Sequence, residues 1–235
     1  KVDMAKGYWQ LPVKKEDRHK TAFQTPMGLF QWTKMPFGLV SAPATFARMM
    51  RKLRLEENSS INFFDDILIY SECWKSHVQS VRDVLGKIRF HGLTARPSKV
   101  FAGFQELEFL GHIVGAGSMK PEASKMKKIL SVGTPQTKKQ VRSVLGLFSY
   151  YRRYVPNFST LTYPLTELTK SNKSKHVVWT EECDKALKSV QEILSSKPVL
   201  VLPDLSKEFV VRTDASSSGI GAALLQEHDG LLHPV

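Results

Sequence analysis

Two adjacent aspartates interrupt a run of strand-forming residues at positions 61–70, and this stretch restricts the possible folds more than any other. Residues 61–64 and 67–70 are rich in Ile and Phe and are separated by two residues, which is the spacing of a β-hairpin. Tight turns prefer Asn-Gly or Asp-Gly because both central residues need positive φ, and two like charges at one turn also repel. We predict a hairpin with Asp65 and Asp66 at its tip. Because this pair is unfavourable for the turn itself, a bound cation would offset the cost, and carboxylate oxygens suit Mg²⁺ or Mn²⁺. The alternative is a solvated turn that merely happens to be acidic.

Composition points to a globular chain with a polyanionic partner. The 235 residues are 42% hydrophobic, enough to form one or two domains with buried cores. Lys and Arg number 34 against 22 Asp and Glu, a net charge of +12, which favours nucleic acid over the weaker alternative of a membrane surface. No apolar run approaches the ~20 residues of a spanning helix, and no signal peptide is evident, so we expect an intracellular protein without a membrane partner.

Cysteine usage and the two chain ends add further expectations. Cys73 and Cys183 lack the spacing of a zinc site or a disulfide framework, so both are interpreted as ordinary thiols. Asp3 lies two residues from the start, where a longer strand would normally precede it, and the chain stops shortly after a turn signal at 228–230. We expect the sequence to be part of a longer polypeptide.

Helical and strand patterns alternate along the chain. Apolar residues at helical spacing predict a helix over 75–90, and Pro43 suits the start of a helix over 44–55. Thr137 and Gln140 form a capping box before an apolar stripe, and Thr180 can cap another helix. Residues 108–114, 209–213 and 219–226 are strand-like. The class is α+β or α/β.

Positive charge is concentrated between residues 120 and 153. This segment holds nine Lys and Arg and one acid, Glu122, so it supplies +8 of the net +12. Helices with such charge suit contacts with phosphates along a duplex, which follow shape rather than sequence. The alternative is a basic face that is only solvated.

Nine short blocks, in this order and spacing, give the chain a resemblance to the reverse transcriptases of gypsy-type LTR retrotransposons, which are part of a Pol polyprotein. The blocks are VDMAKGYWQ (2–10), TAF (21–23), MPFGL (35–39), APATF (42–46), FDDILIYS (64–71), EFLGH (108–112), GL (146–147), YYRR (150–153) and TDA (213–215). One position departs from the family pattern, because Phe63 stands where the family usually has Tyr.

The resemblance implies an α+β fold with the palm, thumb and partial fingers of a right-hand polymerase, followed by a truncated RNase H-like start. The implied domains are the palm with part of the fingers at 1–115, the thumb at 116–162, the connection at 163–205 and an N-terminal RNase H fragment at 206–235. The upstream fingers of the family lie outside this sequence.

The resemblance also implies the site residues of a nucleotidyltransferase. Asp3, Asp65 and Asp66 would be catalytic and bind two Mg²⁺ (or Mn²⁺) ions, with Asp3 and Asp65 as the main ligands because neighbouring strand residues face opposite sides. Tyr8 would lie under the incoming dNTP sugar and exclude a 2′-hydroxyl, and Phe37 would line the nucleotide pocket. For both aromatic residues the alternative is a place in the core.

Primer and template contacts are expected from two further groups of residues. They are Phe109, Leu110, Gly111 and His112 in the block that resembles the primer-gripping hairpin, and Lys127, Lys128, Lys138, Lys139 and Arg142 in the basic segment. Asp214 resembles the first RNase H metal ligand, and RNase H activity is expected only in the full-length parent.

The implied function is that of an RNA-directed DNA polymerase that uses an RNA or DNA template, a DNA primer and dNTPs. In the parent chain its partners would be other Pol segments, protease and integrase, in a cytoplasmic virus-like particle or the nucleus. The alternative function is a catalytically decayed or co-opted element that only binds nucleic acid.

Overall fold

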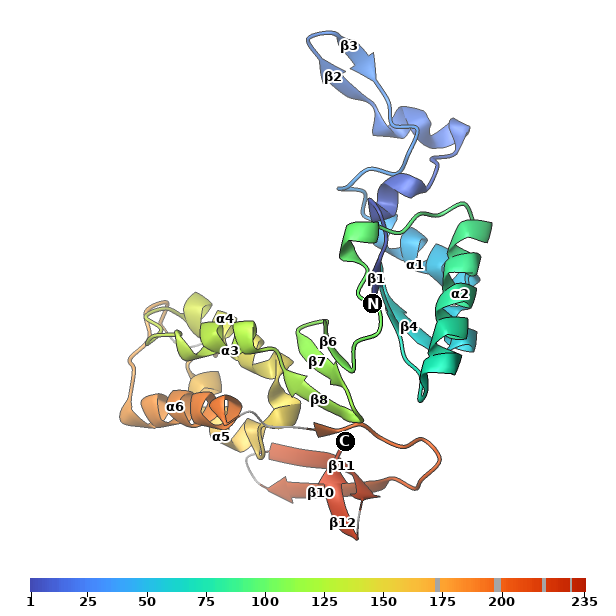
Figure 1. Ribbon diagram of the computed structural model, residues 1–235. Coiled ribbons are helices and arrows are strands. Elements are labelled where there is room, and N and C mark those ends of the chain that lie inside the picture. The colour runs from blue at the N-terminus through green and yellow to red at the C-terminus, as the bar shows by residue number, and fades with distance from the viewer. Residues whose placement is uncertain (172–173, 197–199, 217–218, 229) are drawn as a thin grey trace. The chain divides into compact units, whose positions relative to one another are not determined.

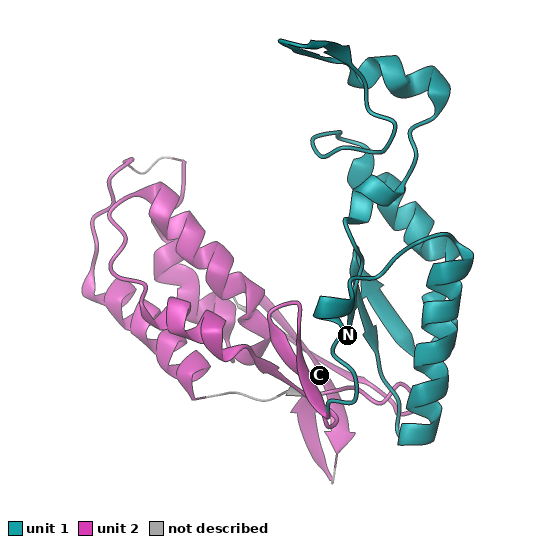
Figure 2. Ribbon diagram, turned by 45° about the horizontal axis from the view of Figure 1, so that its top comes forward, with its two compact units in different colours: residues 1–104 teal, residues 105–235 magenta. Residues whose placement is uncertain are grey.

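Helices and strands alternate along the whole chain (Figure 1), which confirms the predicted α+β class. The computed structural model describes residues 1–171, 174–196, 200–216, 219–228 and 230–235. The chain divides into two compact units, Lys1–Phe104 and Gln105–Val235 (Figure 2). The predicted domain boundaries at residues 115, 162 and 205 are finer than this division and stay predictions.

A three-stranded antiparallel sheet lies at the centre of the first unit. Its strands run in the order β1 (Val2–Asp3), β5 (Asp66–Ile69) and β4 (Ser60–Phe63). Val2 pairs with Ile67, and both side chains are almost completely buried. Burial of this pair places β1 beside the hairpin of β4 and β5.

The predicted hairpin is confirmed, but its turn lies one residue earlier than predicted. Phe63 pairs with Asp66, so the turn residues are Phe64 and Asp65, and Asp66 is the first residue of β5. Phe64 adopts a left-handed φ of 52°, a conformation that costs roughly 1–2 kcal/mol for a residue with a Cβ. Its ring packs against the core of the first unit, and the buried side chain of Ile67 holds the strand in this register.

Two long helices share the core of the first unit with this sheet. Helix α1 (Ala42–Lys52) begins with proline in its first turn, and α2 (Trp74–Phe90) covers the predicted range. Val84 and Ile88 of α2 are buried, but Leu85, another of the apolar residues at the helical spacing that predicted this helix, is 40% exposed. Leu85 lies about 60° around the helix from Ile88, beyond the edge of the buried stripe.

The remaining elements of the first unit are short. They are the hairpin of β2 (Phe23–Thr25) and β3 (Gly28–Phe30), and the 3₁₀ helices η1 (Gly7–Gln10), η2 (Lys15–Thr21), η3 (Leu55–Asn58) and η4 (Pro97–Lys99).

The second unit begins with an antiparallel sheet in the order β6-β7-β8-β9. Its strands are β6 (Glu106–Phe109), β7 (His112–Gly115), β8 (Ser118–Pro121) and β9 (Leu200–Val201). The single strand predicted at 108–114 is therefore wrong in detail, because Leu110 and Gly111 form a turn with φ of 49° and 76°. Lys120, predicted in a helical region, lies on β8.

Four helices build the core of the second unit. They are α3 (Ala123–Leu130), α4 (Lys138–Tyr150), α5 (Phe158–Glu167) and α6 (Glu181–Ser195), with η5 (Arg152–Tyr154) after α4. Both bonds of the predicted capping box between Thr137 and Gln140 are present, and Thr180 caps α6 through the backbone nitrogen of Cys183. Phe148 and Val190 are fully buried between the helices.

A second antiparallel sheet forms the carboxyl-terminal part of this unit, in the order β10 (Val210–Ser216), β11 (Gly219–His228) and β12 (Leu231–Pro234). The sequence pattern predicted the first two strands and missed β12. The side-chain amide of Gln226, which is fully buried, accepts a hydrogen bond from the backbone N–H of Asp204 and donates one to its backbone carbonyl, each at 2.7 Å. These two bonds fix the loop before β10.

Gly115 and Gly146 offer a matched test of this packing. A Cβ on Gly115, which has φ of 151°, would lie 2.0 Å from the Gln105 carbonyl oxygen, whereas nothing lies within 4 Å of a Cβ on Gly146. We expect Gly115→Ala to lower the thermal melting temperature of the chain. Gly146→Ala in α4 should raise it, because alanine is about 1 kcal/mol better than glycine inside a helix. Equal melting temperatures for the two variants would contradict the β6–β7 geometry.

Candidate active site

The three predicted catalytic aspartates gather where β1 meets the β4–β5 hairpin. Asp3 ends β1 and lies directly opposite Asp66 on β5. Residues opposite one another on antiparallel strands direct their side chains to the same face. Asp65 is the neighbouring turn residue, and its carbonyl oxygen accepts the Met4 backbone N–H at 2.9 Å. The structure therefore makes Asp66 the cross-strand partner of Asp3 and places the backbone of Asp65 beside Met4. The roles of the three residues as ligands stay predictions.

Two lysines pair with these carboxylates. Lys99 Nζ lies 3.1 Å from Asp3 Oδ2, and Lys1 Nζ lies 3.1 Å from Asp66 Oδ1. The side chain of Asp3 is 15% exposed and that of Asp66 27%, so each carboxylate can be reached from solvent. Sequence reasoning missed both pairs, since nothing in the local pattern places Lys99 beside a residue 96 positions earlier.

The chemistry of these residues fits a divalent cation. Within the described residues, no three Asp, Glu, His or Cys side chains are arranged as a metal cage. The donors are nevertheless carboxylates, which Mg²⁺ and Mn²⁺ prefer. Asp3 and Asp66 each already hold a cationic group, the ammonium of a lysine. Carboxylates that attract lysine at this position can equally attract a metal ion.

The predicted nucleotide-binding aromatics lie beside this edge of the sheet. Tyr8 belongs to η1, and its ring contacts Phe37 and Phe46 at centroid distances of 5.4 and 5.3 Å. Phe46 is buried, whereas Phe37 is 69% exposed, so Phe37 is not a core aromatic. A Cβ on Gly7 would lie 3.9 Å from the Asp65 Cβ, which places the start of η1 next to the aspartates. Tyr8 thus links an exposed ring to the core near the carboxylates.

In the second unit, the four predicted primer-contact residues form the tip of the β6–β7 hairpin. Two tyrosines hold this tip: Tyr150 donates to the Leu110 carbonyl, and Tyr151 donates to the Gly111 carbonyl at 3.2 Å. His112 stacks on Tyr150 with an interplanar angle of 17°, and Phe109 is buried. The tip is therefore fixed by side chains from the end of α4. Sequence reasoning quoted this tyrosine block without assigning it a role.

The surroundings of His112 favour its neutral form. Burial, and to a smaller extent the charge of Arg153, lowers the pKa of His112 below its usual 6.5. Burial raises the pKa of Tyr151 and Tyr154 to about 12. The Tyr154 hydroxyl oxygen and Nδ1 of His112 lie 2.9 Å apart and share a hydrogen bond.

The five predicted basic contacts divide into two groups. Lys138 Nζ donates to the Lys170 carbonyl at 2.6 Å, and Arg142 donates to the Thr169 carbonyl at 3.0 Å, so both anchor the chain after α5. Lys127 and Lys128 on α3 and Lys139 on α4 have exposed side chains. The second group presents its charge to solvent, whereas the first also bonds to the backbone.

The predicted RNase H residue belongs to the carboxyl-terminal sheet of the second unit. Asp214 lies on β10 opposite Gly221, and it is exposed. Within the described parts of the chain, Asp214 does not belong to a group of three metal-binding side chains.

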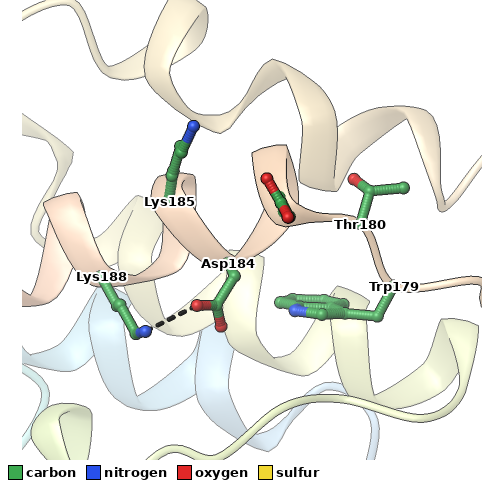
Figure 3. A pocket seen from close by; sticks show the side chains of 6 residues that line it. Trp179, Thr180, Asp184, Lys185 and Lys188 are labelled. Carbon is green, nitrogen blue, oxygen red and sulfur yellow. Dashed lines mark ion pairs between the residues drawn. The ribbon is translucent and has the colours of Figure 1, made fainter.

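A surface hollow of about 520 Å³ lies at the start of α6 and contains none of the predicted site residues (Figure 3). It is lined by Trp179, Thr180, Glu181, Asp184, Lys185 and Lys188. Asp184 pairs with Lys188 at 2.7 Å. Acidic residues in the first turn complement the helix dipole, so the charges of the hollow are explained by α6 itself.

The His112 cluster predicts a pH-dependent stability. Because the folded state lowers the pKa of His112, its contribution to stability is present above about pH 6.5 and is lost as pH falls through the folded pKa. The melting temperature of the wild type should therefore fall more between about pH 7.5 and about pH 5 than that of His112→Phe. His19→Phe, at an exposed histidine, is the control and should keep the wild-type slope. An equal fall of the melting temperature with pH in wild type and His112→Phe would contradict a lowered pKa of His112 in the folded state.

Among the described residues, no helix is long and apolar enough to cross a lipid bilayer.

Residues 1–114 match the family described as reverse transcriptase (RNA-dependent DNA polymerase). Residues 179–235 match the RNase H-like domain found in reverse transcriptase.

Two curated relatives are polyproteins of transposons. The chain is 36% identical over 236 residues to the retrovirus-related Pol polyprotein from transposon 297 of Drosophila melanogaster, covering 100% of this chain and 22% of the relative. It is 34% identical over 231 residues to the transposon Tf2-3 polyprotein of Schizosaccharomyces pombe, covering 97% of this chain and 17% of the relative. The chain thus spans about a fifth of the length of these relatives.

Solved structures of the foamy viral protease-reverse transcriptase share the fold. One, in complex with double-stranded DNA, has a TM-score of 0.87 at 26% identity and covers 96% of this chain and 40% of that protein. Another, in complex with an RNA/DNA hybrid, has a TM-score of 0.84 at 25% identity and covers 99% of this chain and 32% of that protein. The chain belongs to the reverse transcriptases of LTR-retrotransposon Pol polyproteins, and it includes the beginning of their RNase H-like domain.

Proposed function

We propose that this chain forms the polymerase centre of an RNA-directed DNA polymerase, which adds dNTPs to a DNA primer on an RNA or DNA template. The observation that carries the proposal is the pairing of Asp3 with Asp66, with Asp65 at the adjoining turn. In this proposal Asp3 and Asp66, paired across neighbouring strands, and Asp65 at the adjoining turn would act together on one reacting phosphate.

Asp3, Asp65 and Asp66 are the residues that would hold Mg²⁺ or Mn²⁺. In nucleotidyl transfer such ions stabilise the charge on the attacking and leaving oxygens of an in-line displacement. The protein contributes the orientation: antiparallel pairing fixes the backbone of Asp3 and Asp66, and the Met4–Asp65 hydrogen bond fixes the turn.

Tyr8 and Phe37 are proposed to bind the incoming nucleotide. The Tyr8 ring is supported from behind by buried Phe46, so it can resist displacement by a bulkier sugar. Exposed Phe37 is available to pack on the nucleotide. Tyr8 in this role would exclude the 2′-hydroxyl of a ribonucleotide by its size.

A template–primer duplex is the proposed macromolecular partner. Lys127, Lys128 and Lys139 would contact its phosphates, and the β6–β7 turn would contact the primer end. Support comes from the foamy viral relatives, which were solved with double-stranded DNA and an RNA/DNA hybrid. The curated relatives are polyproteins, so protease and integrase segments are the proposed companions of this chain in a longer product.

We assign RNase H activity to that longer product. Hydrolysis of RNA by two metal ions needs several carboxylates at one phosphate. The chain contributes Asp214 on β10 as one of them.

A second candidate function is nucleic-acid binding without catalysis. The ion pairs of Lys99 with Asp3 and Lys1 with Asp66 favour it, because these ammonium groups compete with metal ions for the same oxygens. Primer extension distinguishes the two candidates.

Asp65→Asn should abolish primer extension on an RNA template while leaving template–primer affinity nearly unchanged. The change removes one negative charge and keeps the size of the side chain. We expect a rate at least about 100-fold lower, the usual scale for loss of a group that stabilises transition-state charge. Asp17→Asn is the control, because Asp17 forms an exposed pair with Lys20 in η2. Extension by Asp65→Asn within about tenfold of wild type would contradict the catalytic assignment.

Neutralising Lys127, Lys128 and Lys139 together to Gln should weaken duplex binding and reduce its dependence on salt. Each lost phosphate contact lowers the slope of log K against log salt by about 0.9 for B-DNA. The control changes three exposed lysines on other helices, Lys52, Lys75 and Lys185. Binding would be measured by fluorescence anisotropy over a series of salt concentrations. An unchanged salt dependence in the variant of Lys127, Lys128 and Lys139 would mean that other residues contact the duplex phosphates.

A further inference from the structure

The side chain of Gln10 joins two segments of the first unit that lie far apart in sequence. Its Nε2 donates to the carbonyl oxygens of Ala5 and Thr94, the latter at 3.0 Å. Its Oε1 accepts the Thr94 backbone N–H at 2.7 Å and the Thr94 hydroxyl at 3.3 Å. Both amide hydrogens and both lone pairs of the oxygen are used, which is the full capacity of a glutamine side chain.

These bonds extend a short backbone ladder that begins at Asp3. Arg96 N donates to the Asp3 carbonyl at 2.8 Å, and Ala5 N donates to the Thr94 carbonyl at 2.9 Å. Gln10 then binds Thr94 through both an acceptor and a donor, as a further strand residue would. The backbone of Asp3 is therefore held on one side by β5 and on the other by the ladder that Gln10 completes.

The same side chain also fixes η1, the element that carries Tyr8. This 3₁₀ helix is only four residues long and follows Lys6, which has a left-handed φ of 54° and makes no side-chain cap. Such a short helix has little stability of its own. Gln10 is its last residue, so its bonds to Ala5 and Thr94 tie the helix to the strand that ends in Asp3.

The segment that Gln10 holds leads directly to Lys99. Residues 94–96 pass into η4, whose last residue is Lys99, and Lys99 Nζ contacts Asp3 Oδ2. One side chain thus links the three parts that surround the Asp3 carboxylate: its own strand, η1 and the Lys99 segment.

We infer that Gln10 is a positioning residue, which sets the placement of Asp3 and Tyr8 relative to each other. This inference rests on the proposed polymerase function. Displacement of a reacting group by about 1 Å can cost 10²-fold in rate, so a loosened ladder should reduce catalysis more than binding.

Two variants at position 10 test the inference. Gln10→Met keeps the length of the side chain and removes all four hydrogen bonds. Gln10→Glu keeps an acceptor for the Thr94 N–H but leaves the Ala5 and Thr94 carbonyls without their donor. Gln31→Met is the matched control, at an exposed glutamine.

The first measurement is hydrogen exchange of backbone amides, which needs neither metal nor activity. In both Gln10 variants the amides of Ala5 and Arg96 should exchange at least about tenfold faster, equivalent to about 1.4 kcal/mol of local opening. The amide of Thr94 should do so in Gln10→Met, which removes its acceptor. Amides in α2 should keep their wild-type rates, as should all of these amides in Gln31→Met. Unchanged exchange at Ala5 and Arg96 would overturn the inference.

The second measurement is single-turnover primer extension, normalised to the concentration of active sites. We expect the rate of dNTP addition to fall at least about tenfold in both Gln10 variants, discrimination against ribonucleotides to weaken, and duplex affinity to stay within about twofold. A purely structural role would lower only the active fraction and the melting temperature, and that result would also overturn the inference. If Asp65→Asn extends primers as well as wild type, the proposed function fails, and the exchange data still decide whether Gln10 holds Asp3.

Discussion

The register between β1 and β5 is the constraint on which the rest of the candidate site depends. Val2 and Ile67 are buried partners, and the next pair along the two strands is Asp3 and Asp66. Side chains alternate between the faces of a sheet, so a shift of one residue would move an aspartate into the core and a core residue to the surface. The energy of burying an apolar pair is thereby used to place two carboxylates side by side.

Carboxylates held this close repel one another, and the structure offsets the repulsion with lysines. Both the Lys99–Asp3 and Lys1–Asp66 pairs are partly open to solvent, and such pairs are worth at most about 1 kcal/mol each. A weakly held ammonium group is one that a divalent cation can displace, because the cation brings twice the charge to the same oxygens. The pairing is thus compatible with both candidate functions, and it makes affinity for metal ions the property that separates them.

Local sequence patterns predicted the elements better than their exact contacts. The Thr137–Gln140 capping box depends on residues within one helical turn, and it forms as predicted. The hairpin turn was misplaced by one residue, because the buried position of Ile67 outweighs the backbone cost of a left-handed Phe64. The Gln10 bonds to Thr94 span 84 positions, and no local pattern carries that information. The hairpin pattern identified Asp65 and Asp66 and the family resemblance added Asp3, but the pairing of Asp3 with Asp66 required the fold.

Net charge alone overstates how much of the basic segment is free to bind a polyanion. Lys138 and Arg142 donate to backbone carbonyls after α5, and Lys120 pairs with Glu106 at 2.7 Å. Their charge still adds to the electrostatic potential of the second unit, but their side chains are committed to its internal structure. The proposed phosphate contacts therefore involve the exposed lysines of α3 and α4, and Lys120, Lys138 and Arg142 support the surface that carries those lysines.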